Sequence, residues 1–378
     1  MVSSNYQAIK QANIAILGGG LTGLALAAEL SVPEFSHLSI IVIEPRDEYL
    51  RDKTWSYWRQ TPHSISDCES ATWPAWRVQD ATSAVTIDSN KAENYVYASI
   101  ASDAFYRAAL AKINACSHIE ILQGERVQSI RTESGRAIVT LKSASNIVVN
   151  QFIFDSRPPE KMSKQHFYQH FLSLEMVADK AVFDTSYVDL IAFQASDHGL
   201  HFMQVLPYTA KRALIKSTWI CNHVDHADRA GYTQDLNDYL IKCWPNAKFE
   251  LAYTEAASVP LVAQKAHKQW LGQTQLVPIG ISTGATLSTM SYAFLEALQD
   301  AKRLANLIKT KEPLTSLKRN KIDAWMDALF LLVLQKNVEF GSRAFVRIFS
   351  NCAPARLIRF LTVQASWRDR LAVIRSIL

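Results

Sequence analysis

The sequence has few of the residues that would mark a disulfide-linked, disordered or metal-binding protein. Its five cysteines are far apart in 378 residues, with no CxxC pair and no histidine at metal-ligand spacing, so we expect reduced thiols and no metal site. Glycine and proline number only 12 each, and neither a low-complexity segment nor an internal repeat is present. An ordinary globular protein remains, long enough for two domains or for one large domain with an insertion.

Charge and hydropathy exclude two further classes. The net charge is only +5, and no dense stripe of lysine and arginine with interleaved aromatic residues occurs, so no nucleic-acid partner is expected. The longest apolar run, 324–334, is interrupted and too short to span a bilayer, and the first 13 residues lack the apolar segment of a signal peptide. We therefore expect a cytoplasmic protein; its oligomeric state is left open.

The first strong chemical signal is the stretch NIAILGGGLTGLALAAEL at 13–30. A buried strand is predicted at 14–17, and a helix of small and apolar residues follows the glycines. Gly18 permits a tight turn, Gly20 lets the backbone approach a pyrophosphate, and Gly23 allows close packing of helix on strand. Leu21 and Thr22 begin the helix, whose N-terminus offers unpaired N–H groups and a positive dipole end to phosphates.

A second strand, predicted at 38–43, ends in Glu44. An acid about 20 residues after the glycines suits the hydroxyl pair of a ribose and would repel a 2′-phosphate, so NADP is disfavoured here. The alternative is an ordinary glycine-rich turn, against which the flanking strands and the acid argue together. The motif therefore predicts a dinucleotide site.

Later strands favour FAD over NAD as the nucleotide. Strands predicted at 119–122, 128–131 and 137–142 look like the β-meander of FAD-binding proteins, another at 150–155 ends in an acid, and one at 276–280 leads into a helix at 292–309. We expect FAD to be held non-covalently, with NAD(P)H as an external reductant left open. The further cofactor-binding residues expected from these segments are Val127, Asp155, Gly280 and Gly284.

Several segments, in order along the whole chain, resemble the bacterial type of flavin-dependent lycopene cyclase. The opening LGGGLTGLALAAEL matches that family's first strand, turn and helix, and KTWSY at 53–57 is similar to its His-Thr-Trp-Ser-Phe. FDSR at 154–157, HFLSLE at 170–175, LPYTAKRALI at 206–215 and the glycines of 280–284 with Thr289 and Tyr292 resemble its later motifs. The resemblance implies an isomerisation in which reduced flavin and a carboxylic acid assist protonation of a polyene end, and the carbocation closes to a ring.

Aromatic residues are dense just after the second strand. A carbocation needs an apolar, water-free pocket with aromatic faces, which stabilise positive charge. The alternative is that these side chains only fill the space beneath the FAD domain. The expected pocket residues are Trp55, Tyr57, Trp58 and Tyr292.

The sequence departs from the family pattern at the expected catalytic acid. The family has an acidic pair where this chain has Lys216 and Ser217, and Ser156, Ser173 and Ser291 stand where it has glycine, with Pro158 in place of another. Glu175 is the acid left at a motif position and is the candidate general acid, with a surface carboxylate as the alternative. Lys216 suits an anionic group on substrate or flavin; otherwise it is a solvated strand residue.

The predicted fold class is mixed α/β (α+β), with a Rossmann-like, glutathione-reductase-like FAD-binding domain and an inserted antiparallel sheet. The FAD domain takes 1–160 and 276–310, the substrate domain 161–275, and a C-terminal helical segment 311–378. We expect an FAD-dependent enzyme that acts on a small apolar, polyene-like substrate, with cyclisation as the prototype. An FAD-dependent monooxygenase or dehydrogenase of a smaller compound, or a flavin- or lipid-binding protein without turnover, are the alternatives.

The C-terminal segment also raises the question of membrane contact. Residues 329–378 mix apolar pairs with many arginines, and basic amphipathic helices of this kind can lie on anionic lipid. Peripheral contact at the inner face of the membrane is one interpretation. The other is helices packed on the domain with solvated arginines.

Overall fold

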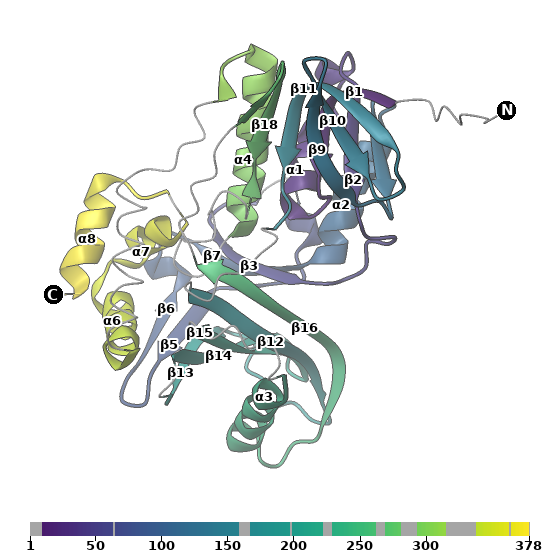
Figure 1. The fold of residues 1–378 in the computed structure, drawn as a ribbon. Coiled ribbons are helices and arrows are strands. Elements are labelled where there is room, and N and C mark those ends of the chain that lie inside the picture. The colour runs from purple at the N-terminus through teal and green to yellow at the C-terminus, as the bar shows by residue number, and fades with distance from the viewer. Residues whose placement is uncertain are drawn as a thin grey trace.

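The computed structural model describes residues 10–62, 65–158, 167–196, 199–221, 229–261, 269–280, 293–314, 338–362 and 364–377. Two large sheets organise the chain, and the polypeptide passes between them more than once (Figure 1). Their combination of a parallel, helix-covered sheet and a largely antiparallel one confirms the predicted fold class.

The first sheet is built around five parallel strands in the order β18-β11-β1-β2-β8. The apolar runs of its central strands are buried on both faces, as a parallel sheet covered by helices requires. An antiparallel β9–β10 hairpin extends β11, and β17 pairs with β18. The segment at 119–122, predicted to belong to the same β-meander as this hairpin, is instead strand β8, which pairs in parallel with β2. The strands are β1 (Lys10–Leu17), β2 (Ile40–Glu44), β8 (Ile119–Gln123), β9 (Val127–Glu133), β10 (Arg136–Leu141), β11 (Asn146–Asp155), β17 (Gln269–Leu271) and β18 (Thr274–Pro278).

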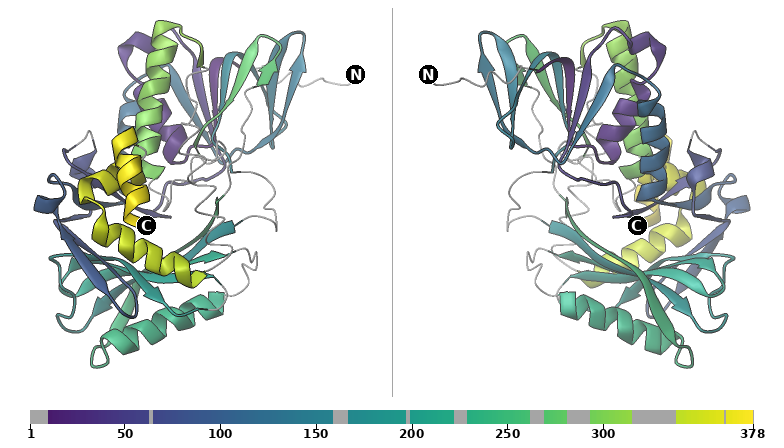
Figure 2. Two further views of the ribbon diagram at one scale, coloured as in Figure 1. Left: turned by 90° about the vertical axis from the view of Figure 1, so that its left-hand side faces the viewer. Right: turned by 90° about the vertical axis from the view of Figure 1, so that its right-hand side faces the viewer.

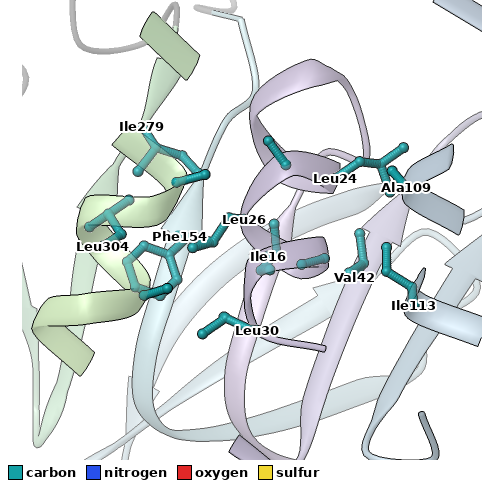
Figure 3. Close-up of a cluster of buried hydrophobic side chains, with 14 of the residues drawn as sticks. Ile16, Leu24, Leu26, Leu30, Val42, Ala109, Ile113, Phe154, Ile279 and Leu304 are labelled. Atoms are coloured by element: carbon teal, nitrogen blue, oxygen red, sulfur yellow. The ribbon is translucent and has the colours of Figure 1, made fainter. Parts of the chain in front are cut away.

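Three helices cover one face of this sheet: α1 (Leu21–Glu29), α2 (Ser102–Asn114) and α4 (Ala293–Thr310). Figure 3 shows their apolar side chains closing on the strands, with Leu26 of α1 between Ile16 of β1 and Phe154 of β11. Leu304 of α4 and Ile113 of α2 belong to the same core. This core fixes the position of α1 and therefore of the glycine turn that precedes it.

The second sheet has seven strands in the order β16-β12-β15-β14-β13-β5-β6, and helix α3 (Arg229–Cys243) covers one of its faces. Figures 1 and 2 show the sheet between α3 and the first sheet with its helices. Two strands of this sheet, β5 and β6, come from the segment predicted as the first part of the FAD domain. The chain therefore alternates between the two sheets more often than domain boundaries at 160 and 275 imply. The division into domains stays a prediction. The strands are β5 (Ala75–Gln79), β6 (Ala84–Asp88), β12 (Phe167–Ala178), β13 (Val188–Gln194), β14 (Leu200–Thr209), β15 (Arg212–Cys221) and β16 (Phe249–Leu261).

A small sheet and three C-terminal helices complete the described structure. The small sheet has the order β3-β7-β4, with β3 at Thr54–Arg59, β7 at Val96–Ala101 and β4 at Ala71–Trp73. Helices α6 (Val338–Asn351), α7 (Pro354–Leu361) and α8 (Trp367–Ile377) pack on a second core that contains Trp58, Trp73 and Trp76. Short 3-10 turns lie at Pro33–Phe35, Ser66–Cys68 and Ser89–Lys91. In the part of the chain that the structure describes, no helix is both long and apolar enough to cross a bilayer.

Candidate functional site

The turn after β1 is held by both neighbouring strands. Gly18 has a φ of +94°, which favours glycine, and its N–H donates to the Ile43 carbonyl at 2.8 Å. The Ser156 hydroxyl donates to the Leu17 and Gly18 carbonyls at 2.8 and 2.9 Å. Ser156, one of the departures from the family's glycines, therefore braces the turn.

Two of the glycines differ in what surrounds them. A Cβ on Gly23 would overlap the Gly18 carbonyl oxygen, so glycine is required there for helix α1 to pack on the turn. A Cβ on Gly20 would meet nothing nearer than Arg46 Nη2, 4.0 Å away. The protein's own packing therefore does not require Gly20, and the space beside it is open to a ligand.

Helix α1 begins at Leu21 and Thr22 without help from side chains. Gly20 is its N-cap residue, no side chain caps the helix, and its first turn contains no acid. Its N-terminal N–H groups and positive dipole end therefore face the open space beside Gly20, which is the arrangement that binds a phosphate anion.

Glu44 lies at the end of β2, beside this turn, and is only 3% exposed. Its carboxylate accepts the Gly19 N–H at 2.6 Å and Arg46 Nε at 2.8 Å. Arg46 also donates to the Gly19 carbonyl and to Asp52, both at 3.1 Å. A ribose bound by Glu44 would therefore have to replace or share contacts of Arg46. Sequence reasoning missed Arg46, although a basic residue two positions after the motif's acid could have drawn attention to it.

A buried hydroxyl without a partner lies at the same place. Tyr49 Oη would collide with a Cβ on Gly19, and it has no hydrogen-bond partner in the described structure. Burial raises the pKa of Tyr49, so the group stays a neutral phenol that can donate a hydrogen bond. An orphaned polar atom, an open space at Gly20 and an uncapped helix end are together what a dinucleotide such as FAD would complete.

The other predicted cofactor residues gather at the same edge, because the carboxyl ends of parallel strands lie together. Asp155 is paired in register with Leu17 on one side and Pro278 on the other. Gly280 has a φ of +64°, and a Cβ there would lie 2.5 Å from the Thr22 hydroxyl oxygen. Gly284 and Tyr292 lie outside the described residues.

Val127, the first residue of β9, follows a loop that returns to the same region. The N–H of Gly124 donates to the Arg46 carbonyl and that of Glu125 to the Glu44 carbonyl, both at 3.1 Å. The loop that leads to Val127 is thus tied to the end of β2, where the predicted ribose acid lies.

The aromatic cluster of β3 is divided between two cores. Tyr57 is fully buried and stacks on Phe294 of α4, with ring centroids 4.8 Å apart, and Trp55 stacks on the same ring at 5.4 Å. Trp58 points the other way and packs edge-to-face on Trp76 in the core beneath the C-terminal helices. Packing alone thus accounts for Tyr57 and Trp58, while Trp55 keeps partial exposure; their roles in a substrate pocket stay predictions.

Alternation along β12 and β15 separates two faces of the second sheet. Leu172, Leu174 and Ile215 belong to the core beneath α3. Ser173, Glu175 and Lys216 therefore point to the opposite face, toward the FAD-domain side (Figure 1). We call this surface the inner face.

A row of polar side chains crosses the inner face. Lys216 of β15 is in register with Ser173 of β12, which is in register with Glu255 of β16. Lys216 Nζ lies 3.6 Å from Glu255 Oε1, and the Ser173 hydroxyl donates to the same oxygen at 3.3 Å. Glu255 is 5% exposed, and the buried Thr218 hydroxyl beside the row has no partner in the described structure. Sequence reasoning missed Glu255, which lies in no recognisable motif.

Glu175 is fully buried one step further along the inner face, between two arginines. Arg51 Nη2 lies 2.7 Å from Glu175 Oε2, and Arg212 contacts the other oxygen. Burial lowers the pKa of Arg51, but the Glu175 carboxylate more than offsets this, so the pKa is raised. Arg51 comes from the loop after β2 and lies over the Tyr253 ring at 3.9 Å. The pair thus ties the FAD-domain loop to the second sheet.

A cavity of about 290 Å³ lies elsewhere, toward α3. The side chains that line this cavity include Val205 and Tyr239 of the core beneath α3, and Trp244, which packs against that core. The core beneath α3 lies on the side of the sheet opposite the inner face. It is therefore separate from the polar row.

Comparisons with known proteins bear on these features. The family described as lycopene cyclase protein matches residues 13–377. No curated protein matches the chain.

Solved structures of similar fold include a flavin-dependent brominase and proteins of other reaction types. A geranylgeranyl bacteriochlorophyll reductase-like protein from Thermoplasma acidophilum is 13% identical with a TM-score of 0.63, covering 98% of this chain and 96% of its own. The p-nitrophenol 4-monooxygenase of Pseudomonas putida is 13% identical with a TM-score of 0.60, covering 98% and 97%. A Diels-Alderase of pyrroindomycin biosynthesis is 11% identical with a TM-score of 0.63, covering 94% and 80%. At these identities the likeness shows the fold.

Proposed function

The chain belongs to the lycopene cyclase family, and from this premise we propose that it is an FAD-dependent enzyme acting on an apolar, polyene-like substrate, with ring closure as the prototype reaction. The uncapped end of α1, the open space beside Gly20 and the Tyr49 hydroxyl support FAD as the cofactor. Bound and reduced, FAD would supply an electron-rich ring system beside the substrate.

The observation that carries the proposal is the polar row of Lys216, Ser173 and Glu255. The family resemblance places a catalytic acid where this chain has Lys216, which by itself argues against cation chemistry. In the polar row, however, the carboxylate of Glu255 lies on the inner face two strands away from Lys216. Ser173 is small enough for Lys216 to reach across it, so the side chain that replaced the family's glycine still leaves room for the ion pair.

The charge of the pair suggests the part that Glu255 plays. The Lys216 ammonium stabilises a negative charge on Glu255 at 3.6 Å. A carboxylate in a protected site can stabilise a nearby carbocation and can accept the proton whose removal ends ring closure. In that step a C–H bond breaks, its electron pair forms the ring double bond, and the proton goes to Glu255.

The surroundings of Glu175 fit a different role. Both of its oxygens are in ion pairs with arginines, an arrangement suited to holding two segments of the chain together. We propose that Glu175 positions the loop carrying Arg51 against the inner face. Its role as general acid stays a prediction, which the turnover of Glu175→Gln in the experiment described below tests.

A second function is favoured by Lys216 itself. Its side chain is 14% exposed on the inner face, and its ammonium group could bind an anionic group of a smaller substrate, as in a monooxygenase or dehydrogenase. A monooxygenase would consume NAD(P)H with oxygen, whereas ring closure would proceed anaerobically with reduced FAD.

The test is turnover of lycopene, as a prototype polyene, under anaerobic and reduced conditions. Glu255→Gln should lower turnover about a hundredfold with FAD binding intact, as expected of a lost general base. Glu250→Gln, an exposed substitution on the same strand, is the matched control and should leave turnover unchanged. Glu175→Gln and Lys216→Ala complete the set. Wild-type kinetics in both Glu255→Gln and Lys216→Ala would place the polar row outside the active site, and FAD binding without turnover would favour a non-catalytic protein.

A further inference from the structure

Helix α8 presents an apolar face to solvent. Trp367, Leu371 and Ile374 are 64%, 44% and 38% exposed, and their spacing of four and three residues places them on one side of the helix. Val373 and Ser376, on the other side, are buried. Figures 1 and 2 show α8 at the periphery of the molecule, beside α7. An apolar face of this kind on the surface of a protein usually marks a contact site.

The same side of α8 carries positive charge without negative charge. Arg368 and Arg375 are exposed beside the apolar residues, and Arg368 lies over the Trp367 ring at 5.3 Å. Asp369, the one acid of α8, is buried and paired with Arg359 at 3.1 Å. We call the side formed by Trp367, Arg368, Leu371, Ile374 and Arg375 the α8 face.

The C-terminal helices concentrate the charge of the whole chain. Residues 338–378 hold seven of the 40 Lys and Arg residues and two of the 35 Asp and Glu residues. Their formal charge is therefore +5, equal to that of the complete chain, so the rest of the protein is neutral in balance.

We propose that the α8 face docks on the surface of an anionic lipid bilayer. A tryptophan and two aliphatic side chains flanked by arginines match the boundary between acyl chains and negatively charged headgroups. A second copy of the chain fits less well, because a symmetric contact would bring like charges together. The inference goes beyond the proposed function and does not depend on it; for an apolar substrate it would place the enzyme where that substrate dissolves.

Vesicle co-sedimentation of the full chain tests the proposal. Wild-type protein should bind vesicles of phosphatidylcholine with phosphatidylglycerol, bind pure phosphatidylcholine more weakly, and lose binding as salt rises. The triple variant Trp367→Ser, Leu371→Ser, Ile374→Ser should bind at least about tenfold more weakly. Arg368→Gln with Arg375→Gln should reduce the preference for anionic lipid.

The chain offers a matched control in Trp270, which is 66% exposed on the edge strand β17. Trp270→Ser should bind vesicles like the wild type, and thermal unfolding should show that every variant is folded. Equal binding by the triple variant and the wild type, or equal loss in Trp270→Ser, would overturn the proposal, as would failure of the wild type to bind. A wild-type dimer that the triple variant converts to a monomer without lipid would assign the α8 face to a second copy instead.

Discussion

Lys216 and Glu255 are on strands that are not neighbours, yet their charged groups lie 3.6 Å apart across Ser173. The side chain of Glu255 is 1% exposed and that of Lys216 14%, so each charge depends on the other for compensation. Both the activity and the stability of the inner face should therefore respond to this pair.

Removal of one partner of the pair should cost more stability than removal of both. Glu255→Ala or Lys216→Ala leaves a largely buried charge without its ionic partner, which we expect to lower the free energy of unfolding by about 3 kcal/mol. The double variant should lose less than the two single losses added together. Urea unfolding of the four proteins measures this coupling. As a control, the exposed pair Arg131 and Glu133 should contribute under about 1 kcal/mol; strictly additive losses at Lys216 and Glu255 would contradict a direct interaction.

Glu175 should affect stability whether or not it is catalytic. Glu175→Gln keeps the size of the side chain but leaves Arg51 and Arg212 without their common partner. We expect a loss of about 3 kcal/mol in the free energy of unfolding, measured in urea. A variant as stable as the wild type, but inactive, would favour the general-acid role over the positioning role.

Gly20, before helix α1, and Gly23, within it, should respond differently to substitution. Gly20→Val places its side chain in open space, so the protein should fold with unchanged thermal stability but lose FAD, because the new side chain blocks the pyrophosphate. Gly23→Ala should destabilise the fold itself, because its Cβ overlaps the Gly18 carbonyl oxygen. Flavin absorbance and thermal unfolding separate these effects. Retention of FAD by Gly20→Val would show that the cofactor does not approach this residue.

Acid should destabilise the protein through His201. Burial lowers the pKa of His201 from 6.5 to about 4, so between these values the unfolded chain binds more protons than the folded one. The contribution that neutral His201 makes to the free energy of unfolding is therefore fully present above pH 6.5. It is lost as the pH falls toward 4. The loss should be at most about 3 kcal/mol, which is the free energy that corresponds to a shift from 6.5 to about 4.

Unfolding free energies at pH 7 and pH 5 measure the effect of His201. In His201→Gln the difference between the two pH values should shrink, since the new side chain does not titrate. The exposed His37→Gln should leave it as in the wild type. An unchanged difference in His201→Gln would show that other groups control the acid sensitivity.

The sequence by itself determined the β1–turn–α1 unit and the acid that follows it. These features are local: Gly18, Gly20 and Gly23 have roles set by backbone geometry within a few residues, and Glu44 ends the next strand. Apolar runs predicted the parallel strands, and the order of short motifs along the chain was enough to indicate the family that the later match confirmed.

The neighbours of the candidate catalytic residues were decided only by the tertiary structure. Glu255 reaches Lys216 because β12 lies between β15 and β16, and register between strands far apart in sequence leaves no local pattern. For the same reason Glu175 is an isolated acid in the sequence pattern, whereas the fold places Arg51 and Arg212 beside it. The aromatic residues of β3 followed a strand pattern, but only packing sent Tyr57 and Trp58 into different cores. Likewise, amphipathic C-terminal helices could be predicted, but which side of α8 stays uncovered depends on where the other helices pack.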